Sequence, residues 1–78
     1  MKPTVGRIVH YVLREGRNTG EHRPAIIVRV WTDTTVQLQV FTDKTNDDMT
    51  DGVIWQTSVM LDDSSEKIGT WHWPERED

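Results

Sequence analysis

The sequence predicts an all-β protein whose five short strands form a small SH3-like barrel. Runs rich in β-branched residues alternate with turn-forming segments, and no stretch repeats its apolar residues with helical spacing. A chain of 78 residues suffices for one small domain, which buries only about 60% of the surface that the unfolded chain exposes. Closing the sheet into a barrel leaves few free strand edges and brings the fifth strand beside the first. An OB-like barrel is the nearest alternative, but it normally needs a longer chain and a helix between its third and fourth strands.

The first expected strand covers residues 5–13 and is apolar on both sides, as in a long, curved strand. Alternation groups its apolar side chains as Val5, Val9, Tyr11 and Leu13 on one side, and Ile8 and Val12 on the other. Residues 15–23 hold two glycines and no aliphatic residue, so we expect a polar surface loop there.

Residues 25–32 and 35–42 are expected to pair as a hairpin around a tight turn at Asp33 and Thr34. Pro24 opens the hairpin, where its missing N–H does little harm. Strict alternation predicts an inner face made of Ile26, Val28, Val30, Val36, Leu38 and Val40.

Two acidic loops flank the fourth expected strand, which covers residues 53–61. We expect the loops at 43–52 and 62–67 to be solvated, so that replacing Asp47 and Asp48 by asparagine changes stability by less than about 0.5 kcal/mol. A short fifth strand at residues 69–74 ends at a proline. The predicted organisation is one barrel domain over residues 1–74 and a charged tail over 75–78.

The composition excludes several classes of protein. A net charge of −4 has the wrong sign for a protein that binds duplex DNA through many phosphates. The chain has no cysteine, which removes disulfides and thiolate sites and suits a reducing cytoplasm, here that of a host cell. No stretch approaches the roughly 18 apolar residues that span a bilayer, so we expect no membrane association.

The most unusual feature is the run Trp71-His72-Trp73 near the end of the chain. Tryptophans two apart share one face of a strand, where they can stack on a base or close a small barrel as a hydrophobic lid. Most arginines lie in the first 29 residues, and guanidinium groups bind phosphates in bidentate fashion. The expected ligand-binding residues, with arginines on phosphate and aromatic rings on a base, are Arg7, His10, Tyr11, Arg23, Trp71, His72 and Trp73.

No motif indicates a metal, a cofactor or catalysis. The aspartates of loop 43–52 do not follow the EF-hand spacing. The histidines at positions 10, 22 and 72 lack a close pair such as His-x-x-x-His, so no zinc site is expected. A phosphate-binding loop and a serine nucleophile elbow are also missing, and we therefore expect a protein that is not an enzyme.

Three segments carry a resemblance to a family of small proteins encoded by tailed phages and prophages. They are Met-Lys-Pro-Thr-Val-Gly-Arg-Ile-Val-His-Tyr-Val at 1–12, Arg-Pro-Ala-Ile-Ile-Val at 23–28 and Gly-Thr-Trp-His-Trp-Pro-Glu at 69–75. The resemblance implies a phage origin but carries no function with it. A fainter resemblance, through Gly6, Ile8, Val9 and residues 23–26, is to the MazF/PemK-type toxin endoribonucleases, and it implies an SH3-like barrel.

Three functional hypotheses follow. The first is a phage-encoded binding protein that sequesters a small nucleotide-like anion, as an anti-defence factor would. The second is a protein-interaction module in which Trp31, Phe41 and Trp55 form a patch that docks a host or phage protein. The third is a MazF-like ribonuclease with Arg23 and His10 as its catalytic pair. In each case we expect a homo-oligomer, because a barrel this small hides apolar surface by self-association.

Overall fold

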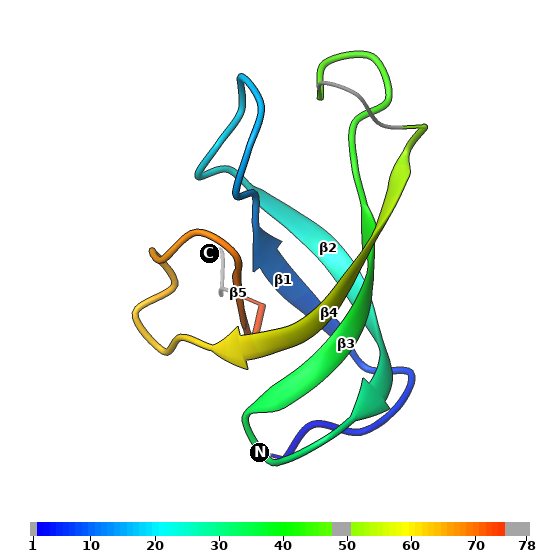
Figure 1. Ribbon diagram of the computed structural model, residues 1–78, viewed down its shortest axis with the longest axis vertical. Helices are drawn as coiled ribbons and strands as arrows, with labels where there is room; N and C mark the ends of the chain where they lie inside the picture. The colour runs from blue at the N-terminus through cyan, green and yellow to red at the C-terminus, as the bar shows by residue number, and fades with distance from the viewer. Residues whose placement is uncertain (1, 48–50, 75–78) are drawn as a thin grey trace.

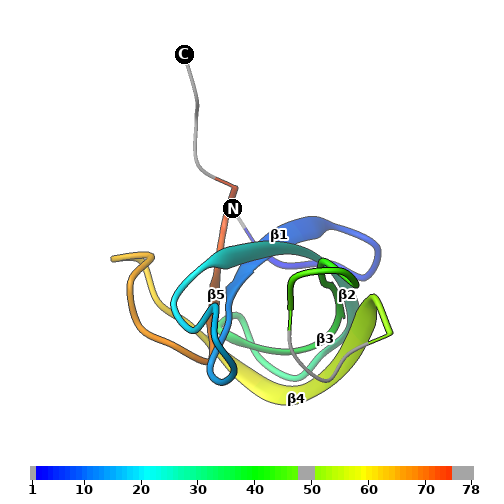
Figure 2. The same ribbon diagram turned by 90° about the horizontal axis from the view of Figure 1, so that it is seen from above.

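The computed structural model describes residues 2–47 and 51–74, and the tail predicted at 75–78 lies outside them. Figures 1 and 2 show five strands wound into a closed barrel with the order β1-β2-β3-β4-β5. Neighbouring strands are antiparallel except for β4 and β5, which run parallel. The strands are β1 (Ile8–Val12), β2 (His22–Val30), β3 (Thr35–Phe41), β4 (Val53–Leu61) and β5 (Thr70–His72). This architecture confirms the predicted all-β, five-stranded, SH3-like barrel.

Apolar side chains from all five strands fill the barrel. Val9, Tyr11 and Leu13, which alternation grouped on one side of the first strand, all point inward, whereas Val5 of the same group precedes β1 and is 67% exposed. Trp71 of β5 is the largest fully buried side chain, and its Nε1–H donates a hydrogen bond to the carbonyl of Thr34 at 3.0 Å. The indole of a buried tryptophan normally needs such a partner. The turn between β2 and β3 is thereby tied to the last strand.

A bulge interrupts the alternation of side chains in β2. Ile27 stands opposite Leu38 while Arg29 stands opposite Gln37, so Val28 is an extra residue in β2. Val28 follows the inward-pointing Ile27, so it points outward and is 44% exposed, and the extra residue returns Val30 to the inner side. The buried residues of β2 are Ala25 and Ile27, with Val30 packed against the core after the bulge.

The predicted inner face of the hairpin was thus correct in one strand and partly wrong in the other. Val36, Leu38 and Val40 of β3 are fully buried as expected. Ile26 and Val28 of β2 are not, because both sides of this strand are apolar and alternation alone cannot choose between them.

A second bulge lies in β4, opposite the middle of β3. Val36 pairs with Val59 and Leu38 pairs with Gln56, so β4 also carries one extra residue. Ser58 adopts a left-handed φ of 50° there. Ile54 packs on the core before the bulge, and Val59 and Leu61 do so after it. The two bulges give the long strands the local bend and twist that a small closed barrel requires.

Residues 2–47 and 51–74 include no helix with the length and apolar character needed to cross a membrane.

Candidate functional site

Arg23 lies at the mouth of the barrel, on the inner side of β2. It stands opposite Tyr11 of β1, whose side chain is in the core. Its Nε donates to Oδ2 of Asp47 at 2.8 Å and its Nη2 donates to Oδ1 of the same carboxylate at 2.6 Å. The two side chains are 15% and 4% exposed. The remaining donors reach Oε1 of Glu21 at 3.2 Å and the carbonyl of His22 at 2.9 Å.

Asp47 is therefore a structural residue, and its predicted solvation was wrong. Besides Arg23, it accepts hydrogen bonds from Nδ2 of Asn18 at 2.8 Å and from the backbone N–H of Asp43 at 2.7 Å. The hydrogen bonds from Arg23 hold the pKa of the Asp47 carboxyl well below its usual range, and the same pairing raises the pKa of Arg23. Asp48, the other residue of that prediction, lies outside the described residues.

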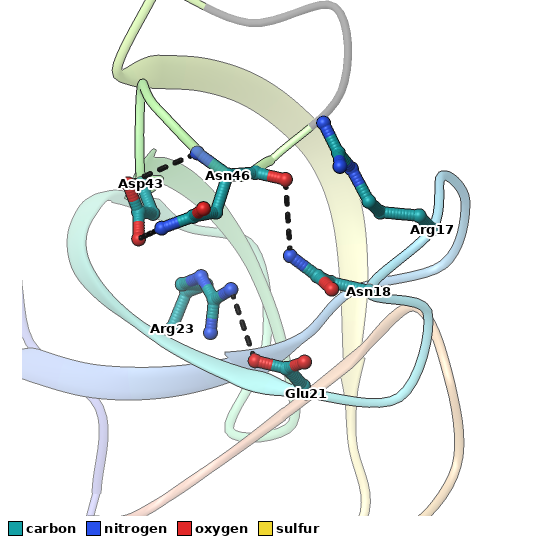
Figure 3. A pocket seen from close by; sticks show the side chains of 6 residues that line it. All are labelled: Arg17, Asn18, Glu21, Arg23, Asp43 and Asn46. Carbon is teal, nitrogen blue, oxygen red and sulfur yellow. Dashed lines mark hydrogen bonds and ion pairs between the residues drawn. The ribbon is translucent and has the colours of Figure 1, made fainter.

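A polar pocket of about 370 Å³ opens beside this ion pair, between the loop after β1 and the loop after β3 (Figure 3). Its lining balances positive and negative charge, because two arginines face two carboxylates. The guanidinium of Arg23 already donates to Asp47, Glu21 and a backbone carbonyl, so little of it remains for a phosphate. The lining residues are Arg17, Asn18, Glu21, Arg23, Asp43 and Asn46.

The tryptophan pair does not form an open stacking platform. Tyr11 and Trp71 have no exposed surface, so the expectation that they stack on a base was wrong, and they fill the barrel instead. Trp73 is half-buried and packs edge-on against Trp71 with ring centroids 5.3 Å apart. The guanidinium of Arg7 lies 5.5 Å from the centroid of the Trp73 ring. Of the expected aromatic platform, only this Arg7–Trp73 pair remains at the surface.

The outer side of the same barrel wall brings together His10, His22 and His72, which we call the histidine cluster. His10 of β1 pairs directly with His72 of β5, and His22 pairs with Val12, two residues along β1 from His10. The ring centroids of His10 and His72 are 5.6 Å apart, and those of His22 and His72 are 4.7 Å apart. One ring nitrogen from each histidine lies within 4.8 Å of the others. His72 is buried, being 2% exposed.

The sequence predicted that His10 and His72 belong to one ligand-binding site, but it did not place His22 beside them. It predicted that barrel closure sets the last strand beside the first, and the pairing of His10 with His72 confirms this. His22 was assigned to a loop, whereas it is the first residue of β2. Close spacing in the sequence identifies metal ligands that share one helix or one turn. It does not identify ligands that come together from three strands. The missing signal was the register of β2 against β1.

The catalytic pair of the ribonuclease hypothesis is not assembled. His10 points to the outer side of the barrel wall with His72, while Arg23 lies on the inner side with Tyr11. The two side chains therefore project from opposite sides of the barrel wall.

Apolar side chains also continue across the outer side of the barrel from β1 to β4. Ile8 pairs with Ile26, Ile26 with Gln39, and Gln39 with Trp55, so the four lie in one row. Two residues along β3 from Gln39, and therefore on the same side, Phe41 pairs with Val53 of β4. We call this surface the outer apolar face, and it consists of Ile8 at 58%, Phe41 at 41%, Val53 at 43% and Trp55 at 48% exposed, with the half-buried Ile26.

Trp31, the third residue of the predicted docking patch, is 50% exposed. Its ring lies under the guanidinium of Arg29 at 4.0 Å, and its Nε1–H donates to Oε1 of Gln37 at 3.1 Å.

Comparison of the chain with protein-family models, with curated proteins and with solved structures finds no match.

Proposed function

We propose that the protein is a non-enzymatic binding module that contacts a protein partner through its outer apolar face. The observation that carries the proposal is the row from Ile8 through Ile26 and Gln39 to Trp55, which crosses four strands. Single exposed apolar side chains are ordinary on a protein surface, whereas a group of them gathered on one face, here with the polar Gln39 between Ile26 and Trp55, marks an interaction site.

The chemistry of the outer apolar face suits burial against a protein. Its five residues carry no charge, so a partner can cover them without removing an ion from water. Trp55 and Phe41 add aromatic surface, and aromatic side chains contribute strongly to binding when they enter a desolvated pocket. The charged residues that give the net charge of −4 lie outside this face.

Site-specific photo-crosslinking tests this proposal. A photoreactive phenylalanine analogue replaces Trp55 in the chain produced in bacterial cells, which the phage resemblance makes the natural setting. The matched control places the same analogue at Ile68, which is 50% exposed and lies in the β4–β5 loop. We expect a covalent protein adduct from position 55 and none from position 68. No adduct at position 55, or equal adducts at both positions, would contradict the proposal.

The mass of the adduct also identifies the partner. An adduct of two identical chains establishes the expected homo-oligomer, and sedimentation of Ile8→Glu should then show a monomer while Ile68→Glu remains associated. An adduct with a different mass identifies a host or phage protein.

Capture of a small nucleotide-like anion is a second candidate, favoured by the Arg7–Trp73 pair. A half-buried indole beside a guanidinium offers a stacking surface and a cation in one place. His10 and His72, the other expected ligand contacts, belong to the histidine cluster on the outer side of the wall, where His72 is buried. Arg23, Tyr11 and Trp71 drop out of this hypothesis because an ion pair or the core already occupies them.

Calorimetric titration with linear and cyclic nucleotides tests the second candidate. Trp73→Ala should weaken binding at least tenfold, since base stacking contributes about 1–3 kcal/mol. Trp31→Ala is the matched control, because Trp31 is also paired with an arginine but lies elsewhere on the barrel. The idea fails if no nucleotide binds more tightly than about 100 μM, or if both variants bind like the parent chain.

A further inference from the structure

Within residues 2–47 and 51–74, one group of side chains has the composition and proximity that a metal ion requires, and it is the histidine cluster. The chain contains three histidines in all, and the fold brings every one of them to this place. They come from the middle of β1, the first residue of β2 and the last residue of β5. Neither protein-partner docking nor nucleotide capture requires that arrangement.

We propose that the histidine cluster binds a divalent transition-metal ion, with Zn²⁺ as the ion that its ligands suit best. Imidazole nitrogen is a preferred ligand of zinc, copper and nickel, whereas calcium and magnesium prefer oxygen. Zinc held by three histidines at about 2.0–2.1 Å in tetrahedral geometry places the ligand nitrogens about 3.4 Å apart. The nitrogens of the histidine cluster lie within 4.8 Å of one another, so modest rotations of the rings bring them to that spacing.

Neutral imidazole offers a nitrogen lone pair to a metal ion, and three imidazoles this close together can share one ion. The net charge of −4 adds a weak, long-range attraction for cations.

The three histidines leave a fourth coordination position. His72 is buried, but His10 and His22 are half-buried, so the histidine cluster reaches solvent through these two residues. A tetrahedral zinc with three protein ligands completes its coordination with water or an exogenous ligand, as sites open to solvent do. The proposed site therefore differs from a closed structural zinc site, in which the protein supplies all four ligands.

Metal binding would also stabilise the attachment of β5, the shortest strand of the barrel. β5 has three residues and is held by two register pairs with β1 and two with β4. A metal bonded to His72, His10 and His22 cross-links β5 to β1 and β2 across the closure of the barrel. Because the unfolded chain does not hold these ligands together, metal binding should stabilise the folded state.

Titration of the full chain, free of any polyhistidine tag and treated with a chelator, tests the proposal with ZnCl₂ as the probe. Calorimetry should show one site with a Kd below about 10 μM. At a hundredfold excess of Zn²⁺ over Kd, the Tm should rise by about 10 °C or more, as expected for a domain of this size. Titration with CoCl₂ should give the visible absorption bands of a tetrahedral Co²⁺ complex.

The decisive variant is His22→Gln, since His22 lies at the start of a strand and its replacement leaves the core intact. It should bind Zn²⁺ at least tenfold more weakly and lose the metal-induced rise in Tm, while its Tm without metal stays close to that of the parent chain. Asp63→Asn, which removes an exposed carboxylate from the β4–β5 loop, is the control and should bind like the parent.

Three results would overturn the proposal: no rise in Tm with Zn²⁺, a stoichiometry other than one, or His22→Gln binding as tightly as Asp63→Asn. None of them bears on the outer apolar face, whose crosslinking test uses other residues.

Discussion

In one stretch of the barrel wall, β5, β1 and β2 lie side by side. The inner and outer sides of this stretch carry side chains of different chemistry. On the inner side, Trp71, Tyr11 and Arg23 form one cross-strand row, and each is either packed in the core or neutralised by a carboxylate. On the outer side, the neighbouring residues of the same strands form the histidine cluster. Residues adjacent in sequence, such as His22 and Arg23, therefore belong to different environments.

This difference shows that residue type alone does not identify a binding residue. Arginine next to a polar pocket suggests anion binding, yet Asp47 and Glu21 already occupy donors of Arg23. Histidine scattered at wide sequence spacing suggests no metal site, yet the closed barrel brings the three together. What a polar side chain can bind depends on the partners that the fold has supplied to it.

The largest contrast between the two sides should come from Trp71→Ala. Removing a fully buried indole should lower the free energy of unfolding by about 3–5 kcal/mol, a large part of the total for a domain of this size. Urea denaturation followed by circular dichroism measures this loss. His22→Gln, on the outer side, should cost far less in the absence of metal, and equal losses would contradict the division between the two sides. If Trp71→Ala does not fold, the half-buried Trp73 provides the weaker variant Trp73→Ala.

Asp47→Asn should have the next largest effect. It removes the carboxylate that neutralises Arg23 in a setting where both side chains are nearly buried, which should cost about 2 kcal/mol in the free energy of unfolding. Thermal and urea melts provide the measurement, and Asp63→Asn at an exposed position should leave stability nearly unchanged. A loss below about 0.5 kcal/mol for Asp47→Asn would show that the ion pair contributes little.

Acid should destabilise the protein through the same carboxylate. The pKa of Asp47 lies below its usual range in the folded state because Arg23 donates hydrogen bonds to it, and backbone N–H donors, chiefly that of Lys67, lower the pKa of Asp62 to about 2. A depressed folded-state pKa stabilises the protein above the unfolded value and ceases to do so as pH falls. The free energy of unfolding should therefore decrease from about pH 4 toward pH 2.

Urea denaturation across that range measures the slope. In Asp47→Asn the slope should be shallower, with only the smaller contribution of the exposed Asp62 and other surface carboxylates remaining. The same slope in the variant and the parent would assign the acid sensitivity to other groups.

Tyr11→Phe should have the smallest effect, and an unusual sign. The Tyr11 hydroxyl is buried in the inner row and finds no hydrogen-bond partner among the described residues, and burial raises its pKa. Removing an unsatisfied buried hydroxyl should leave the free energy of unfolding unchanged or increase it by up to about 1 kcal/mol. Chemical denaturation measures it, and a loss of more than about 1 kcal/mol would reveal a hydrogen bond to this group.

Much of the fold could be predicted from the sequence, because β-strands and the turns between them have recognisable local sequence patterns. The fourth strand was predicted at residues 53–61 and is found there, and the third differs by one residue. The grouping of Val9, Tyr11 and Leu13 on one side of the first strand was also correct, although Val5 of the same group is exposed. The errors lie where one strand has apolar residues on both sides, as at Ile26 and Val28, since alternation alone does not say which side faces inward.

The candidate site was less accessible to sequence reasoning. Two pairs among the expected ligand-binding residues do meet, His10 with His72 and Arg7 with Trp73, because barrel closure sets the last strand beside the first. The interior position of Trp71 and the partner of Arg23 could not be chosen in the same way. Each depends on which side of a strand faces inward and on where a loop more than twenty residues away folds back.

The sequence by itself determined that this chain forms strands, how many there are and roughly where each begins and ends. It did so because turn residues and β-branched runs act through their immediate neighbours. The tertiary structure alone decided which polar residues meet: Arg23 with Asp47 inside the mouth of the barrel, and His10, His22 and His72 outside its wall. Those meetings depend on the register of strands that are distant in sequence, and register is a property of the closed sheet as a whole.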